Sequence, residues 1–190
     1  MMIIDVREAY HRALEDFGAL VHRIGPEQWD SPTPCVDWDV RDLVNHVVGE
    51  NLWAPELLGG RAVAEIGDAF EGDLLGDDPI KAFDTSAVAA MQATGGAGSL
   101  TRVVHLSFGD VSGREYVTEL FADALIHTWD LARAIGADER LDPELVEACT
   151  VWFSGAGNGY RPAGAGAERQ GTSSEADAQA DLLASWGRQA

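Results

Sequence analysis

The sequence predicts a mainly α protein, organised as a four-helix bundle with short peripheral additions. Apolar residues recur at three- and four-residue steps through most of the chain, which is the period of one-sided helices. Only the segment Leu100–Phe108 has the β-branched content of a strand. A long connection separates the second predicted helix from the helix that begins near Arg114, and a bundle accommodates such a connection as a crossover.

Composition restricts the classes of partner. The chain has 190 residues, with Lys+Arg 13 against Asp+Glu 32, so its formal net charge is −19. At 46% hydrophobic residues it has enough apolar side chains for one domain with a sizeable core. A charge of this sign repels phosphate backbones and anionic lipid, and no basic patch offsets it. We therefore expect no nucleic-acid partner and no membrane partner.

The apolar segments and the cysteines of the chain indicate its compartment. No apolar run approaches the roughly 18 residues of a membrane span, and the start of the sequence has neither the basic nor the apolar region of a signal peptide. A cytoplasmic location is expected. Cys35 and Cys149 lie far apart without CxxC spacing, so we expect small buried hydrophobes rather than a disulfide or a cysteine metal site.

The first two helices have clear boundaries in the sequence. One covers Asp5–Ile24, with Asp5 as N-cap and Gly25-Pro26 after it. The segment Trp29–Asp37 carries two prolines and is expected to be an ordered loop. The second helix covers Asp39–Leu58, with Asp42 as the acidic half of a capping box, and Pro55 is expected to kink it or end it early.

The crossover region is predicted to contain little regular structure. Arg61–Asp78 is acidic and glycine-bearing, and we expect a long loop with a short helix. A third helix covers Pro79–Ala93 and ends before Gly95-Gly96. Leu100–Phe108 is expected to form one short strand or a hairpin, because turn residues follow it.

The strongest helical pattern comes next, over Arg114–Ile135, with Gly136 placed as a C-cap. A fifth helix is predicted over Asp142–Phe153. Ser154–Gly171 is rich in Gly and Ala and is expected to be a flexible link, followed by a short helix over Ser174–Trp186. The chain is thus divided into a helix bundle, residues 1–154, and a short C-terminal appendage, residues 155–190.

Two helices carry residues of chemical interest at matching spacing. His46 borders the apolar stripe of the second helix, and Glu50 lies one turn further on. Asp123 and His127 are four residues apart on the Arg114 helix and therefore project from one face. Facing helices would bring the three groups together, and two imidazoles with one carboxylate suit a divalent metal with an open coordination position. Such pairs are also common as surface hydrogen bonds or ion pairs, so spacing alone leaves both interpretations open.

The neighbours of this group have two interpretations each. Asp130, three residues after His127, would bond a ligating imidazole or pair with Arg133, and we favour the ion pair. Cys35 has no electropositive neighbour in the sequence, which favours a structural role over a nucleophilic one. Trp38 is expected to pack, or to form the wall of a substrate pocket. The templates GxSxG, GxxxxGK[ST] and HExxH are absent from the sequence.

Two segments resemble a known family. WDSPTPCVDWDVRDLVNHVVGEN (Trp29–Asn51) and DALIHTWDLARAIG (Asp123–Gly136) resemble the mycothiol-dependent maleylpyruvate isomerase N-terminal family, and the tail ADAQADLLASWGRQA is similar to the ending of its shorter members. The resemblance implies a DinB-like four-helix bundle with a long crossover. It also implies that His46, Asp123 and His127 hold a divalent metal, with Asp123 standing where the isomerase has glutamate.

The resemblance also implies a class of chemistry. A metal ion, zinc first with nickel or iron as alternatives, would activate a small thiol such as mycothiol for addition to a small electrophile, with Glu50 as candidate base. The isomerase carries a second small domain, whereas Cys149–Ala190 is glycine-rich with weak patterning, so maleylpyruvate isomerisation itself is not the expected reaction. The alternative is a non-catalytic bundle whose metal is structural or sensory. Homodimerisation is compatible with either hypothesis.

Overall fold

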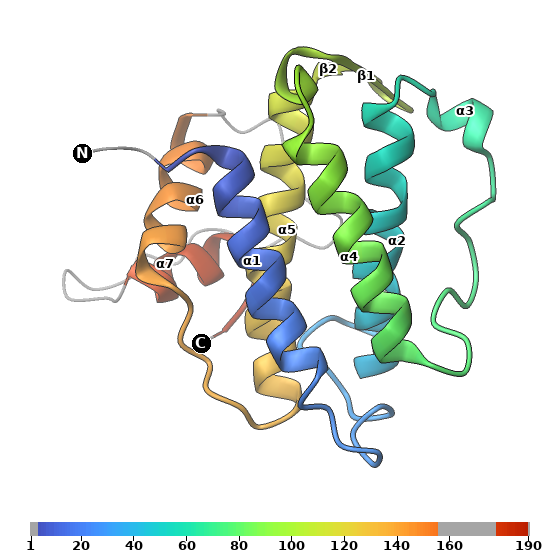
Figure 1. Ribbon diagram of the computed structural model, residues 1–190. Coiled ribbons are helices and arrows are strands. Elements are labelled where there is room, and N and C mark those ends of the chain that lie inside the picture. Colours follow the sequence, from blue (N-terminus) through green and yellow to red (C-terminus); the bar gives the residue numbers. More distant parts are fainter. Residues whose placement is uncertain (1–3, 156–177, 190) are drawn as a thin grey trace.

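The computed structural model describes residues 4–155 and 178–189 and confirms a mainly helical fold. Four long helices make the bundle: α1 (Val6–Val21), α2 (Val40–Leu58), α4 (Pro79–Gly95) and α5 (Gly113–Ala134). They lie side by side in Figure 1. Helix α1 packs on α5, α2 packs on α4, and α1–α4 and α2–α5 contacts complete the bundle. Its core contains large side chains that are almost fully buried, among them Tyr10, Phe17, Phe121 and Trp129.

The first two helices begin where the sequence predicts. The Asp5 side chain accepts a hydrogen bond from the backbone N–H of Arg7, and Asp39 and Asp42 form a capping box. Helix α1 ends at Val21, earlier than predicted, because the chain tightens into a turn in which Ile24 N donates to Val21 O. Pro55 lies inside α2 without ending it, and the helix continues to Leu58.

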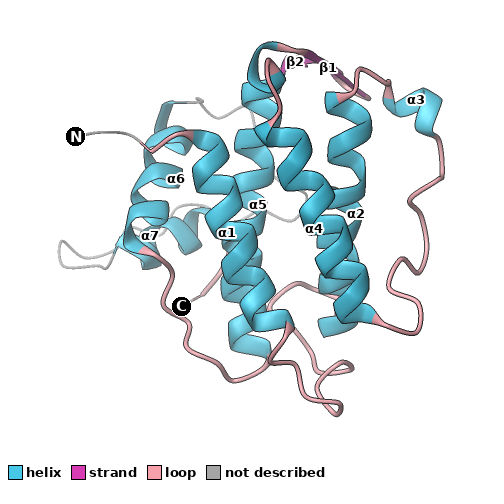
Figure 2. Ribbon diagram, viewed as in Figure 1, coloured by secondary structure: helices cyan, strands magenta, loops and turns pink. Residues whose placement is uncertain are grey.

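The crossover contains the expected short helix, α3 (Val63–Ile66), before α4 begins with Asp78 as N-cap and Pro79 in the first turn. A 3₁₀ turn, η1 (Ser99–Thr101), leads into a hairpin of β1 (Val103–Leu106) and β2 (Gly109–Ser112). The strands are antiparallel, with Val104 opposite Val111. Figure 2 shows the hairpin at one end of the bundle, directly before α5. The strand prediction is thus confirmed.

The hairpin fixes where α5 starts. Gly113, the first residue of α5, lies so close to the backbone of Ser99 that any Cβ atom there would overlap its carbonyl oxygen. Its N–H donates to Arg102 O at 2.7 Å. This close approach sets the start of the helix that carries Asp123 and His127.

The C-terminal part packs on the outside of the bundle. Helix α6 (Pro143–Gly155) contacts α5 and α1, and α7 (Ala178–Ser185) contacts α6. Leu182 and Leu183 of α7 are buried, and Trp186 lies against Phe153 with ring centroids 5.5 Å apart. The predicted link over Ser154–Gly171 lies outside the described residues except for its first two positions, which belong to α6. The division at residue 154 stays a prediction.

None of the described helices combines the length and the apolar character that crossing a membrane requires.

Candidate metal centre

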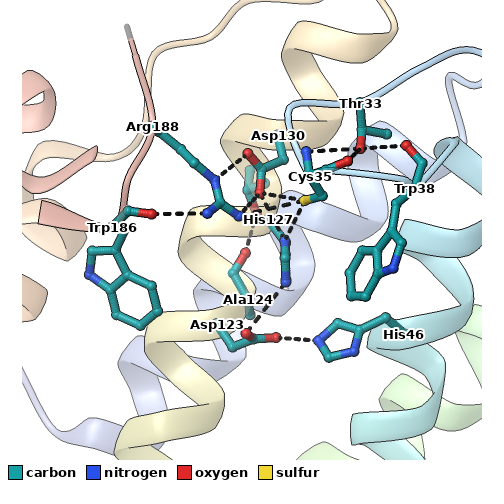
Figure 3. A network of polar contacts seen from close by, with 11 residues as sticks. Thr33, Cys35, Trp38, His46, Asp123, Ala124, His127, Asp130, Trp186 and Arg188 are labelled. Carbon is teal, nitrogen blue, oxygen red and sulfur yellow. Dashed lines mark hydrogen bonds and ion pairs between the residues drawn. The ribbon is translucent and has the colours of Figure 1, made fainter. Parts of the chain in front are cut away.

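The structure brings His46, Asp123 and His127 together between α2 and α5. His46 Nε2 lies 3.0 Å from Asp123 Oδ2, and His127 Nε2 lies 3.4 Å from Asp123 Oδ1. The two imidazole rings are 5.0 Å apart at 76°. Figure 3 shows the Asp123 carboxylate in contact with both rings. Three ligand atoms of these residues lie within 4.8 Å of one another, which suits a single metal ion.

The site is closed on one side and open on the other. The His127 side chain is only 8% exposed, whereas the His46 and Asp123 side chains are 29% and 25% exposed. A group held by these residues would therefore be anchored from inside the bundle and approached from solvent beside His46. Catalytic metal sites have this arrangement of protein ligands and an open position.

The charges of these residues shift one another's pKa values. Burial acts to raise the pKa of Asp123, but His127 and His46 hold that pKa well below its usual range. Burial acts to lower the pKa of His127, but Asp123 and Asp130 raise it well above its usual value. Without a metal, the geometry therefore favours a protonated His127 held between the carboxylates of Asp123 and Asp130. A metal cation would replace the proton on His127 Nε2.

Asp130 has a different partner from the one the sequence favours. His127 Nδ1 donates to Asp130 Oδ2 at 2.9 Å, and Asp130 is fully buried. Arg133 instead pairs with Glu139 at 3.1 Å and lies over the Trp129 ring. The prediction of an Asp130–Arg133 pair is wrong, because the Asp130 side chain points into the protein. A buried carboxylate on the second nitrogen is the usual partner of a metal-ligating histidine.

Arg188 is the residue that sequence reasoning missed. Its Nε and Nη2 donate to Asp130 Oδ1 and Oδ2 at 2.9 and 2.8 Å, across 58 positions of the chain. Spacing within one helix carries no signal for such a contact. Figure 3 shows the guanidinium beside Asp130, on the far side from His46.

Cys35 also differs from expectation. It is half-buried rather than a buried hydrophobe, and its Sγ lies 3.3 Å from Asp130 Oδ2 and 3.5 Å from Arg188 Nη2. No cationic residue is near Cys35 in the sequence, but the fold brings Arg188 from a distant part of the chain into contact with it. Cys149 is buried, as predicted.

A second group of donors, Cys35, His127 and Asp130, also lies within 4.8 Å. The Arg188 guanidinium contacts both Asp130 and Cys35, so a permanent cation already neutralises this group. His46, Asp123 and His127 have no such cation among their contacts in the described part of the chain. The chemistry of the donors therefore favours this first group for a metal ion.

The loop before α2 forms one wall of the site. The Trp38 ring centroid lies 5.0 Å from that of His46 and 6.0 Å from that of His127. Thr33 holds the loop, since its hydroxyl donates to Trp38 O and accepts from Cys35 N. The sequence left open whether Trp38 packs or forms a pocket wall, and the structure places it against the candidate ligands.

Glu50 lies one turn beyond His46 on α2. Burial, and then the charge of Asp123, raises its pKa to about 7. Glu119, one turn before Asp123 on α5, has its pKa raised to about 7 by burial and by Glu115 and Glu50. Carboxyl groups with such pKa values can exchange protons near neutral pH.

Comparison with known proteins adds a family. Residues 10–132 match the model of the mycothiol maleylpyruvate isomerase N-terminal domain. Two uncharacterized proteins of Mycobacterium tuberculosis, MT0763 of strain CDC 1551 / Oshkosh and Rv0738 of strain ATCC 25618 / H37Rv, are each 34% identical to this chain over 142 residues. These matches cover 75% of this chain and 74% of either relative. No solved structure matches.

Proposed function

Because the chain belongs to the mycothiol maleylpyruvate isomerase N-terminal domain family, we propose that it binds a divalent metal ion and activates a small thiol. The ligands are His46, Asp123 and His127, and the ion is zinc, with nickel or iron as alternatives. The thiol is mycothiol or a similar molecule, and its acceptor is a small electrophile. The observation that carries the proposal is the convergence of three ligand atoms from two helices on one partly open position.

The residues present fit a metal ion. Two imidazole nitrogens and one carboxylate oxygen are ligands that zinc accepts in catalytic sites. His127 has an outer partner in Asp130, at 2.9 Å. An ion at this position supplies one step of chemistry, which is deprotonation of a bound thiol.

The protein's own side chains have separate tasks in this proposal. Glu50, half-buried one turn from His46, accepts the proton that the thiol releases. Trp38 covers the two histidine rings and limits access of water from the loop side. Asp130 keeps His127 in one orientation. We propose the cytoplasm as the location of the reaction, because small thiols are kept reduced there. The free state of Cys35 and Cys149 agrees with a reducing compartment.

Thiol titration of the metal-loaded protein tests this function. We expect zinc-loaded protein to bind mycothiol by calorimetry and to consume an electrophile such as chlorodinitrobenzene only when thiol is present. Glu50→Gln should bind the metal normally and conjugate at a rate lower by about 10²-fold or more. If fully loaded protein neither binds the thiol nor conjugates the electrophile, the proposed activity is wrong.

A second candidate is a metal site without catalysis. Its support is that the ligands come from α2 and α5, so that an ion would tie two helices of the bundle together. A purely structural or sensory metal predicts a large loss of thermal stability with chelator and no thiol affinity. Thermal melts with and without chelator, run beside the thiol titrations, separate the two candidates.

A further inference from the structure

Arg188 contacts the candidate centre from a part of the chain that the family match does not cover. It follows α7, whereas the matched residues end at 132. Its guanidinium makes two hydrogen bonds to Asp130, and the Arg188 side chain is 16% exposed. Asp130 in turn accepts the hydrogen bond from Nδ1 of His127. A continuous chain of contacts therefore joins the C-terminal segment to a candidate metal ligand.

The fork of the guanidinium determines where Asp130 points. Nε binds Oδ1 and Nη2 binds Oδ2, so the carboxylate is held in one plane and cannot turn away from His127. Asp130 has no exposed surface, and a buried carboxylate without such a partner would be strongly unfavourable.

Arg188 is itself held in place by the C-terminal segment. Its Nη1 donates to the carbonyl of Trp186 at 3.0 Å, and its backbone N–H donates to Leu183 O at 2.9 Å. Leu183 is fully buried and Trp186 packs on Phe153. The guanidinium is thus presented to Asp130 by a packed element rather than by a free side chain.

We infer that Arg188 is a positioning residue for the metal centre. By fixing Asp130, it keeps His127 with Nδ1 directed to Asp130 and Nε2 directed to Asp123 and the metal position. This inference rests on the metal site proposed above and adds the C-terminal segment to it. Docking of α7 thereby becomes part of what determines metal affinity.

The test compares Arg188→Met with Arg188→Lys and with the matched control Arg133→Met, which removes an arginine paired with Glu139 instead. Zinc affinity is measured by competition with a chromophoric chelator, and the ligand geometry by the visible spectrum of bound cobalt. We expect roughly 10- to 100-fold weaker zinc binding in Arg188→Met with an altered cobalt spectrum. Arg188→Lys should recover part of the affinity, because it keeps the charge without the fork. Arg133→Met should match the parent.

A second measurement needs no metal. In protein labelled with ¹⁵N-histidine, the Nδ1 proton of His127 should give a protected signal in the parent and in Arg133→Met. In Arg188→Met that signal should be lost to exchange with water. If Arg188→Met does not fold, Arg188→Lys is judged by the same two readouts.

The outcomes separate this inference from the proposed function. Parent protein that cannot be loaded with metal overturns the proposed function, while the histidine signal still decides whether Arg188 holds His127 in one orientation. Folded Arg188 variants with parental zinc affinity, cobalt spectrum and histidine signal overturn the inference, whatever the fate of the proposed activity.

Discussion

His46 Nε2 and Asp123 Oδ2 lie 3.0 Å apart although 77 positions separate them in the chain. The contact joins α2 to α5, and the other carboxylate oxygen of Asp123 faces His127. Asp123 is therefore the centre of the three-residue group, and its charge is what holds both imidazoles toward one point.

Changes at Asp123 should separate charge from length. Asp123→Asn keeps the size but removes the negative charge of a proposed ligand. We therefore expect zinc affinity to fall by on the order of 100-fold or more, at or beyond the upper end expected for loss of an outer partner. Asp123→Glu keeps the carboxylate and should stay within about tenfold of the parent. Competition titration measures both variants. Parental affinity in Asp123→Asn would show that this carboxylate is not a ligand.

A buried polar chain should control the stability of the bundle. Tyr10 Oη donates to Asn51 Oδ1, and Asn51 Nδ2 donates to Ser86 Oγ, which links α1, α2 and α4. We expect Asn51→Ala to cost about 2–4 kcal/mol in urea unfolding, because it leaves polar groups without partners and a cavity. Tyr10→Phe should cost about 1 kcal/mol. The double variant should cost less than the sum, and strict additivity would contradict the contact.

Two helical glycines should respond in opposite ways to alanine. At Gly113 the new Cβ would overlap the backbone of Ser99, so Gly113→Ala should lower the free energy of unfolding by about 3 kcal/mol or more. At Gly49 the Cβ would meet only Leu74 Cδ1 at 3.4 Å, which is an ordinary contact. Gly49→Ala should therefore raise the free energy of unfolding by about 0.5–1 kcal/mol. Thermal melts measure both variants. A tolerated Gly113→Ala would contradict the described junction of η1, hairpin and α5.

The raised pKa of Glu119 predicts a pH-dependent stability. Burial, Glu115 and Glu50 raise that pKa from 4.5 to about 7, so the folded protein holds the proton more tightly than the unfolded chain. The free energy of unfolding should therefore fall as pH rises from about 4.5 to about 7, and the cost should be fully present above 7. Glu119→Gln should be more stable than the parent at pH 8, by on the order of 1 kcal/mol after allowance for partial exposure, and similar to it at pH 4.

The control for this prediction is Glu147→Gln, because Glu147 is exposed on α6 and its loss changes the net charge equally. Urea unfolding at both pH values gives the comparison. Equal gains at pH 8 in the two variants would attribute the effect to net charge rather than to the position of Glu119.

Local signals in the sequence predicted most of the fold. Asp5, and Asp39 with Asp42, mark helix starts through hydrogen bonds to residues two or three positions away, so these signals are readable without tertiary structure. Helical spacing likewise placed Asp123 and His127 on one face of α5. The metal role of these residues with His46 stays a prediction.

Contacts between segments far apart in the sequence could not be predicted from local signals. Asp130 was assigned to Arg133 because sequence spacing reports only neighbours on the same helix. The structure pairs Asp130 with His127, the alternative interpretation from the sequence, and also with Arg188, which spacing could not indicate. The position of Arg188 depends on where α7 packs, and Arg188 also contacts Cys35. The burial of Glu50, which is the main cause of its raised pKa, could not be predicted from the sequence either.

Metal content of protein purified without an affinity tag tests the central claim most directly. Elemental analysis should find close to one divalent ion per chain in the parent, and little in folded His46→Ala and His127→Ala. His105→Ala, at a histidine paired with Asp110 on the exposed hairpin, is the matched control and should retain the ion. A parent that contains no metal and cannot be loaded with zinc or nickel, or His127→Ala with parental content, would contradict a metal centre at His46, Asp123 and His127.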